Sequence, residues 1–146
     1  MRKSALFLAA AILAFNAQAG GAAGVFKVVT GNVSVQRGEQ RLPASVGMQV
    51  QVADVIRTGK DGSAGLVFQD NSLLSLGPAS RLVVDHFSFD STTHDGQFET
   101  TLARGKLAVV SGKIAKHQLD AMKVYTPTSI LGIRGTEFVV EAEGKE

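Results

Sequence analysis

Residues 124–140 read V-Y-T-P-T-S-I-L-G-I-R-G-T-E-F-V-V. A short β-type run ends at Thr126, and a β-branched and aromatic run closes the stretch. Pro127 fixes its own φ angle and keeps the preceding threonine extended, so the break in the backbone is local. Gly132 and Gly135 permit a positive φ or a close approach of another backbone. The pattern predicts two strands joined by a bent connection.

Arg134 is the one long charged side chain among the small and apolar residues of this connection. A guanidinium carries five hydrogen-bond donors. We therefore predict a buried or half-buried arginine that ties backbone carbonyls to a carboxylate, so that Arg134→Ala lowers the thermal midpoint. Asp54, Asp70 and Glu137 are the candidate partners, and ligand binding by Arg134 is the alternative.

Apolar residues alternate with polar ones along most of the chain, which is the period of strands with one buried face. The alternating sets are Phe26 and Val28; Val33 and Val35; Val50 and Val52; Ala64, Leu66 and Phe68; Leu74 and Leu76; Leu82 and Val84; Phe87 and Phe89; Phe98, Thr100 and Leu102; and Leu107 and Val109. Turn residues separate these runs at Asp61-Gly62, Asp70-Asn71, Gly77-Pro78 and Asp95-Gly96. The sequence predicts an all-β domain, with residues 115–122 as a loop or a single helical turn.

Two stretches of the chain have the same pattern. Residues 31–38 read G-N-V-S-V-Q-R-G, and residues 105–112 read G-K-L-A-V-V-S-G. Later, I-R-T at 56–58 parallels V-Y-T at 124–126. One such unit cannot cover its apolar face, whereas two can, so we predict two similar β-units stacked on each other. A β-sandwich is the alternative that the pattern leaves open.

Residues 1–19 have the features of a secretory signal peptide. Arg2 and Lys3 precede an apolar run that is shorter than the ~20 residues of a membrane span. Ala17-Gln18-Ala19 fits a cleavage site, so we expect a periplasmic or secreted protein without a membrane span after cleavage near Ala19. The remaining chain has 13 basic and 13 acidic residues. This balance argues against nucleic-acid binding.

Motifs for catalysis or metal binding do not stand out. The chain has no Cys, and His86, His94 and His117 do not have the spacing of a zinc site. Residues 90–96 lack the spacing of a calcium loop, and we interpret them as a solvated hairpin tip. The chain has neither a G-x-S-x-G nucleophile motif nor a phosphate-binding loop. We therefore predict a non-enzymatic protein without a cofactor or metal.

Five motifs follow one another along the chain. They are G-N-V-S-V at 31–35, V-G at 46–47, A-D-V-I-R-T-G at 53–59, G-S-A-x-L-V-F-Q-D-N-S at 62–72 and the closing T-P-T-x-x-x-G-I-R-G-T-E-F at 126–138. In this order they resemble the motifs of the FecR domain, the periplasmic module of iron-responsive sigma-factor regulators, and the last is similar to its C-terminal signature. We assign structural roles to the matching positions Asp54, Thr58, Gly59, Asp70, Thr126, Pro127, Gly132, Arg134, Gly135 and Thr136. Thr58 and Thr126 are expected to bond local backbone groups.

The resemblance covers residues 31–141, after a lead-in and first strand at 20–30 and before a tail at 142–146. It implies a rolled, β-solenoid-like all-β fold. It also implies a non-catalytic exported module of the bacterial envelope that binds another, unidentified envelope protein in signalling or assembly. We expect a stand-alone version, without the cytoplasmic anti-sigma segment and membrane helix of typical members. A periplasmic ligand- or polysaccharide-binding protein and, with less support, a small envelope hydrolase are the alternatives.

Overall fold

The computed structural model describes residues 21–135 and 137–144. Strands dominate these residues, and the all-β prediction is confirmed. The elements are β1 (Gly24–Thr30), β2 (Val33–Arg37), β3 (Gln40–Pro43), β4 (Gln49–Val50), β5 (Val55–Thr58), β6 (Ser63–Phe68), β7 (Leu73–Leu76), β8 (Arg81–Phe89), β9 (Gly96–Val110), α1 (Lys113–His117), β10 (Met122–Tyr125), β11 (Ile130–Ile133) and β12 (Glu137–Ala142). The predicted turns lie between β5 and β6, β6 and β7, β7 and β8, and β8 and β9.

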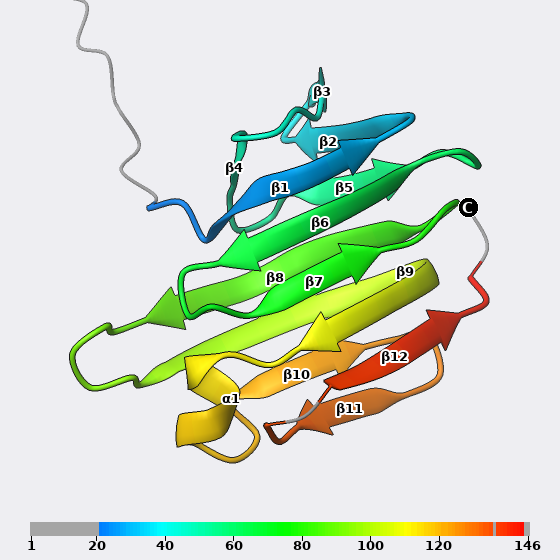
Figure 1. Cartoon of the computed structure of the whole chain (residues 1–146). Helices are drawn as coiled ribbons and strands as arrows, with labels where there is room; N and C mark the ends of the chain where they lie inside the picture. Colours follow the sequence, from blue (N-terminus) through cyan, green and yellow to red (C-terminus); the bar gives the residue numbers. More distant parts are fainter. Residues whose placement is uncertain (1–20, 136, 145–146) are drawn as a thin grey trace, which may run out of the picture.

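The strands form one curled sheet that folds over into two layers (Figure 1). The layer that we call the β2 layer runs β3-β2-β5-β8-β9-β10-β11. The layer that we call the β1 layer runs β4-β1-β6-β7-β9-β12. Strand β9 belongs to both, because its first part pairs with β8 and its last part with β7 and β12.

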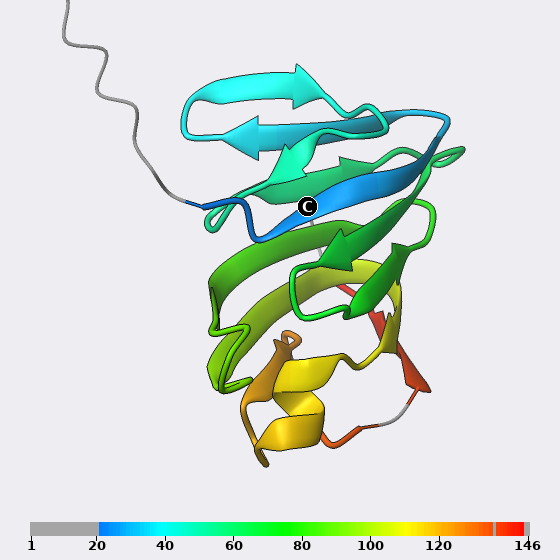
Figure 2. The same cartoon turned by 60° about the vertical axis from the view of Figure 1, so that its left-hand side comes forward.

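The chain crosses repeatedly from one layer to the other as it proceeds along the roll. Figures 1 and 2 show this progression as the change from blue and cyan at one end to orange and red at the other. Each layer therefore takes strands from both halves of the chain. The two similar stretches lie in different layers, since residues 31–38 include β2 and residues 105–112 include the end of β9. This winding of the chain agrees with the rolled, solenoid-like all-β fold that the family resemblance implies.

The hydrophobic core fills the space between the layers. The ring of Phe98, on β9 in the β2 layer, lies 4.4 Å from the ring of Phe68 in the β1 layer and 5.0 Å from that of Phe87. The fully buried large side chains are Phe26, Phe68, Phe98, Ile56, Leu66, Leu74, Leu76, Leu82, Leu102, Leu107, Ile114 and Met122. All of them except Ile56, Ile114 and Met122 come from the alternating positions that the sequence indicates.

Four of the expected core positions differ. Val28 is exposed because the register of β1 shifts between Phe26 and Val28, which turns Val28 to the outer face. Val52 is exposed because the chain leaves β4 after Val50. Phe87 and Phe89 are only half-buried, on the part of β8 that leads into the β8–β9 hairpin.

The C-terminal stretch contains three strands where the sequence predicts two. Residues Met122–Tyr125 and Ile130–Ile133 form the hairpin β10–β11, and Glu137–Ala142 then crosses to the other layer as β12. The extra strand is short, and Gly132 in its middle weakens its sequence signal. The predicted loop or single turn at residues 115–122 overlaps only the end of α1, a helix of five residues that begins at Lys113, and its last residue, Met122, already belongs to β10.

Gly105 lies where β9 passes from one layer to the other. Its φ of +98° falls in the region that glycine adopts easily. A Cβ at this position would overlap the side chain of Ser80 and lie 2.5 Å from its Cα. The Oγ of Ser80 accepts a hydrogen bond from the backbone N–H of Lys106 at 3.0 Å. Both the backbone conformation and the close approach therefore require a glycine.

Candidate functional site

Asp54 is one of the two buried carboxylates of the family pattern, with 1% of its surface exposed. It accepts hydrogen bonds from Nε and Nη2 of Arg37, at 2.8 and 2.7 Å, and from the backbone N–H of Gln51 at 2.8 Å. Donation of these hydrogen bonds to the Asp54 carboxylate raises the pKa of Arg37 above its ordinary value. Arg37 has no distinguishing sequence context, and for this reason the sequence does not identify it as the partner.

Asp70, the other buried carboxylate, accepts three hydrogen bonds. They come from the backbone N–H and the Oγ of Ser72, at 3.1 and 2.7 Å, and from the backbone N–H of Ile114 at 3.3 Å. The carbonyl of Asp70 also accepts from the N–H of Lys113. Asp70 therefore fastens the β6–β7 turn to the first turn of α1.

Thr58 joins two turns of the roll. Its Oγ1 donates to the carbonyl of Gly77 at 2.6 Å and accepts from the N–H of Ser80 at 2.9 Å. The partners are backbone groups, but the expectation of local ones is wrong for Thr58, because Gly77 and Ser80 are 19 and 22 residues away along the chain. The N–H of the next residue, Gly59, donates to the carbonyl of Asn32 at 2.8 Å.

The C-terminal signature residues surround the β10–β11 hairpin and the turn after it. Thr126 and Pro127 lie in the hairpin connection, where the Oγ1 of Thr126 donates to the carbonyl of Ser129 at 3.3 Å. A Cβ on Gly132 would meet Oδ1 of Asp120 at 2.9 Å. Gly135 has a φ of +59°. Thr136 lies outside the described residues.

The expectation of a buried Arg134 is wrong. The side chain is exposed to solvent, in the turn between β11 and β12. Two of its candidate partners are occupied elsewhere, since Asp54 binds Arg37 and Asp70 binds Ser72 and the start of α1. A half-buried arginine does bind a buried carboxylate in this fold, but that arginine is Arg37.

We expect Arg37→Ala to lower the free energy of unfolding by about 2 kcal/mol, because it leaves a buried carboxylate with one backbone donor. Arg134→Ala is expected to change it by less than about 0.5 kcal/mol, because the side chain is exposed. Urea unfolding followed by circular dichroism measures both. Equal losses in the two variants would restore a structural role for Arg134.

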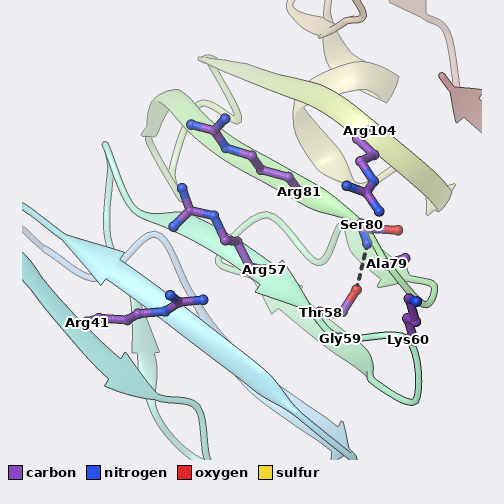
Figure 3. Close-up of a pocket in the computed structure, with 9 residues that line it drawn as sticks. All are labelled: Arg41, Arg57, Thr58, Gly59, Lys60, Ala79, Ser80, Arg81 and Arg104. Carbon is purple, nitrogen blue, oxygen red and sulfur yellow. Dashed lines mark hydrogen bonds between the residues drawn. The ribbon is translucent and has the colours of Figure 1, made fainter. Parts of the chain in front are cut away.

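A strongly basic cavity opens on the outer face of the β2 layer. Arg57 on β5 lies directly opposite Arg81 on β8, which lies opposite Arg104 on β9 (Figure 3). Arg41, on β3, faces the same space. The cavity has a volume of ≈ 380 Å³, and the other described residues that line it are Thr58, Gly59, Lys60, Ala79 and Ser80. We call it the arginine cavity. Of these residues, only Thr58 and Gly59 are among the positions to which the family pattern assigns a structural role.

The roll has an open end at β11, β12 and the loop that follows α1 (Figure 1). Within the described residues, β11 pairs only with β10 and β12 only with β9. Ile130, Val139 and Leu119 are exposed there, at 68, 64 and 57% of their surface. The opposite end is blunted, because β4 has two residues and β3 contains Arg41 and Pro43.

The hairpin tip at residues 90–96 is exposed, as expected. Oδ1 of Asp90 accepts from the N–H groups of Thr92 and Thr93, and these bonds lower the pKa of Asp90. The fold brings His117 within 3.0 Å of Asp95, and the ring of His94 lies 6.3 Å from that of His117. Within residues 21–135 and 137–144, no group of three or more His, Cys, Asp or Glu side chains is arranged to hold a metal.

Among the residues that the structure describes, no helix has the length and apolar character needed to cross a membrane. Comparison with protein-family models matches residues 54–146 to the FecR protein family. Comparisons with curated proteins and with solved structures find no match. The matched residues form more than half of the chain and include both buried carboxylates and the C-terminal signature. The chain therefore belongs to the FecR protein family.

Proposed function

We propose that this protein is a non-catalytic, exported module of the bacterial envelope that binds another envelope protein in signalling or assembly. Membership of the FecR family supports an envelope role. The structural use of Asp54 and Asp70, the two buried carboxylates of the pattern, supports a scaffold that recognises rather than reacts. We place the mature protein in the periplasm, after cleavage near Ala19.

The observation that carries this proposal is the unpaired edge of β12. It has six residues, Glu137–Ala142, and one side of it is open within the described residues. An open strand edge presents backbone N–H and C=O groups to which an extended segment of another chain can add as a further strand. Val139 adds an exposed apolar side chain in the middle of this edge.

The charges of β12 define the partner segment. Glu137, Val139 and Glu141 alternate with the inward-facing residues and lie on the outer face of the strand. Opposite charges stabilise directly opposed positions on neighbouring strands, and apolar side chains pair with each other. The partner is an extended protein segment with an apolar residue opposite Val139 and Lys or Arg opposite the two glutamates.

The test uses two valines with the same exposure. Val139 and Val46 are both 64% exposed, but Val46 lies in the loop between β3 and β4. Val139→Lys places a positive charge opposite a basic partner segment, so we expect about tenfold weaker binding of that segment. Val46→Lys is expected to leave binding unchanged. Both variants keep the thermal stability of the wild type, because exposed substitutions change it little.

The partner segment is identified by photocrosslinking from position 141 in periplasm, followed by mass spectrometry. A synthetic peptide of the crosslinked segment is then titrated against the wild type and the two variants. Protection of the β12 amides from hydrogen exchange supports strand addition. Binding that Val46→Lys weakens as much as Val139→Lys, or that neither variant weakens, would refute the β12 interface.

A further inference from the structure

The arginine row crosses three neighbouring strands of the β2 layer. Arg57, Arg81 and Arg104 are paired directly across β5, β8 and β9. Like charges in directly opposed positions destabilise a sheet. Burial and the positive charges of Arg81 and Arg41 lower the pKa of Arg57. The folded protein therefore holds these cations together against their mutual repulsion.

The hydrogen bonds that Arg41, Arg57 and Arg81 form with the described residues leave the charge of these three side chains uncompensated. Nη1 of Arg57 donates to Oε1 of Gln36 at 2.6 Å, and Nε of Arg41 donates to Oγ of Ser34 at 3.3 Å. Both acceptors are neutral. Nε of Arg81 is buried and has no hydrogen-bond partner among the described residues. Among the residues that the structure describes, none that lines the cavity is acidic.

The floor of the cavity is fixed before any ligand arrives. Thr58 and Ser80 are buried and hydrogen-bonded to each other, as the dashed line in Figure 3 marks. Ala79, at the rim, has a φ of +51°, and its N–H donates to the carbonyl of Gly59 at 2.9 Å. A non-glycine residue in this conformation costs on the order of 1 kcal/mol and points to a site where shape matters.

We propose that the arginine cavity binds a small ligand that carries a phosphoryl group. Guanidinium forks pair bidentately with phosphate oxygens, and neighbouring strands place successive forks about 4.8 Å apart. A phosphoryl group has three terminal oxygens and up to two charges, so it engages arginines from more than one strand. A carboxylate has two oxygens and one charge. The volume of ≈ 380 Å³ is within the range of small-molecule sites, about 300–1,000 Å³.

The test is calorimetric titration with inorganic pyrophosphate at low ionic strength. We expect binding that weakens steeply with added salt and a thermal midpoint that rises with pyrophosphate. Arg81→Gln and Arg57→Gln are each expected to reduce the affinity about tenfold or more. Neither variant is expected to lower the midpoint of the free protein, because each removes a like-charge contact.

Arg134→Gln is the matched control. It removes the same charge from an exposed arginine in the turn between β11 and β12, away from the cavity-lining strands β3, β5, β8 and β9. Affinity for pyrophosphate is expected to stay unchanged in this variant. Equal weakening in Arg134→Gln and Arg81→Gln would show only the effect of net charge and would refute the site. Absence of binding in the wild type would also refute it.

A second measurement distinguishes a soluble phosphate ester from a lipid headgroup. Vesicles of phosphatidylglycerol and phosphatidylcholine in equal parts are sedimented with the protein, and vesicles of phosphatidylcholine alone are the control. Co-sedimentation that pyrophosphate reverses supports a headgroup ligand, and binding of pyrophosphate without co-sedimentation supports a soluble one. This site and the β12 edge use different strands, so failure of one test leaves the other standing.

Discussion

Gly105→Ala is expected to prevent stable folding. The new Cβ would overlap the side chain of Ser80 and lie 2.5 Å from its Cα, and the φ of +98° is unfavourable for alanine. Relief of the overlap requires β9 to move away from the β7–β8 turn, at the point where β9 passes between the layers. We expect a loss of more than about 4 kcal/mol, which approaches the whole stability of a small domain.

Gly38→Ala separates the two causes. Gly38 has a φ of +61°, but a Cβ there would have no atom within 4 Å. This variant is expected to lose only the conformational term, about 1 kcal/mol. Urea unfolding followed by far-ultraviolet circular dichroism measures both. A Gly105→Ala protein with a transition close to that of Gly38→Ala would mean that the crossing of β9 is not tightly packed.

Asp70→Ala is expected to cost about 3 kcal/mol or more. The carboxylate has no exposed surface and accepts hydrogen bonds from Ser72 and from the N–H of Ile114. Its removal leaves buried donors without an acceptor, and each such donor costs about 1–3 kcal/mol. The first turn of α1 then loses its attachment to the β6–β7 turn. Early hydrogen exchange at Gly112 and Ile114 is the expected local signature.

Asp85→Ala is the control for this variant. Asp85 is exposed and accepts one hydrogen bond, from Oγ1 of Thr101 at 2.6 Å. Its replacement is expected to change stability by less than about 1 kcal/mol. Asp70→Asn should fall between the two, because an amide keeps one acceptor oxygen. Equal stability of Asp70→Ala and Asp85→Ala would contradict the fastening role of Asp70.

The period-two alternation was enough to predict the all-β class and most of the core, because burial on one face of a strand is a local pattern. Register shifts are not local. The shift in β1 depends on how β1 pairs with β6, so the exposure of Val28 was not predictable. The bend of β9 at Gly105 depends on the approach of Ser80. A single strand that serves both layers gives no distinct signal in the sequence.

The candidate sites were less predictable than the fold for the same reason. Arg57, Arg81 and Arg104 are far apart in the sequence, and only the pairing of three strands places them in one row. The family signature contains Arg134, the one long charged side chain of its loop, and the sequence therefore predicts Arg134 as the partner of a buried carboxylate. The arginine that binds a buried carboxylate is instead Arg37, at the end of β2. The sequence predicts an ion pair between an arginine and a buried carboxylate, but it does not indicate which arginine forms this pair.

The sharing of β9 between the layers also has a consequence for the order of folding. Strand β7 pairs with β6 on one side. It gains a neighbour on the other side only when its residues Leu73–Leu76 pair with residues 107–110 of β9. A chain that emerges from its N-terminus first therefore carries an unsatisfied β7 edge until position 110 is free to pair. Such an edge invites association with other chains. A nascent protein of this architecture has to be kept from aggregating until the later strands arrive.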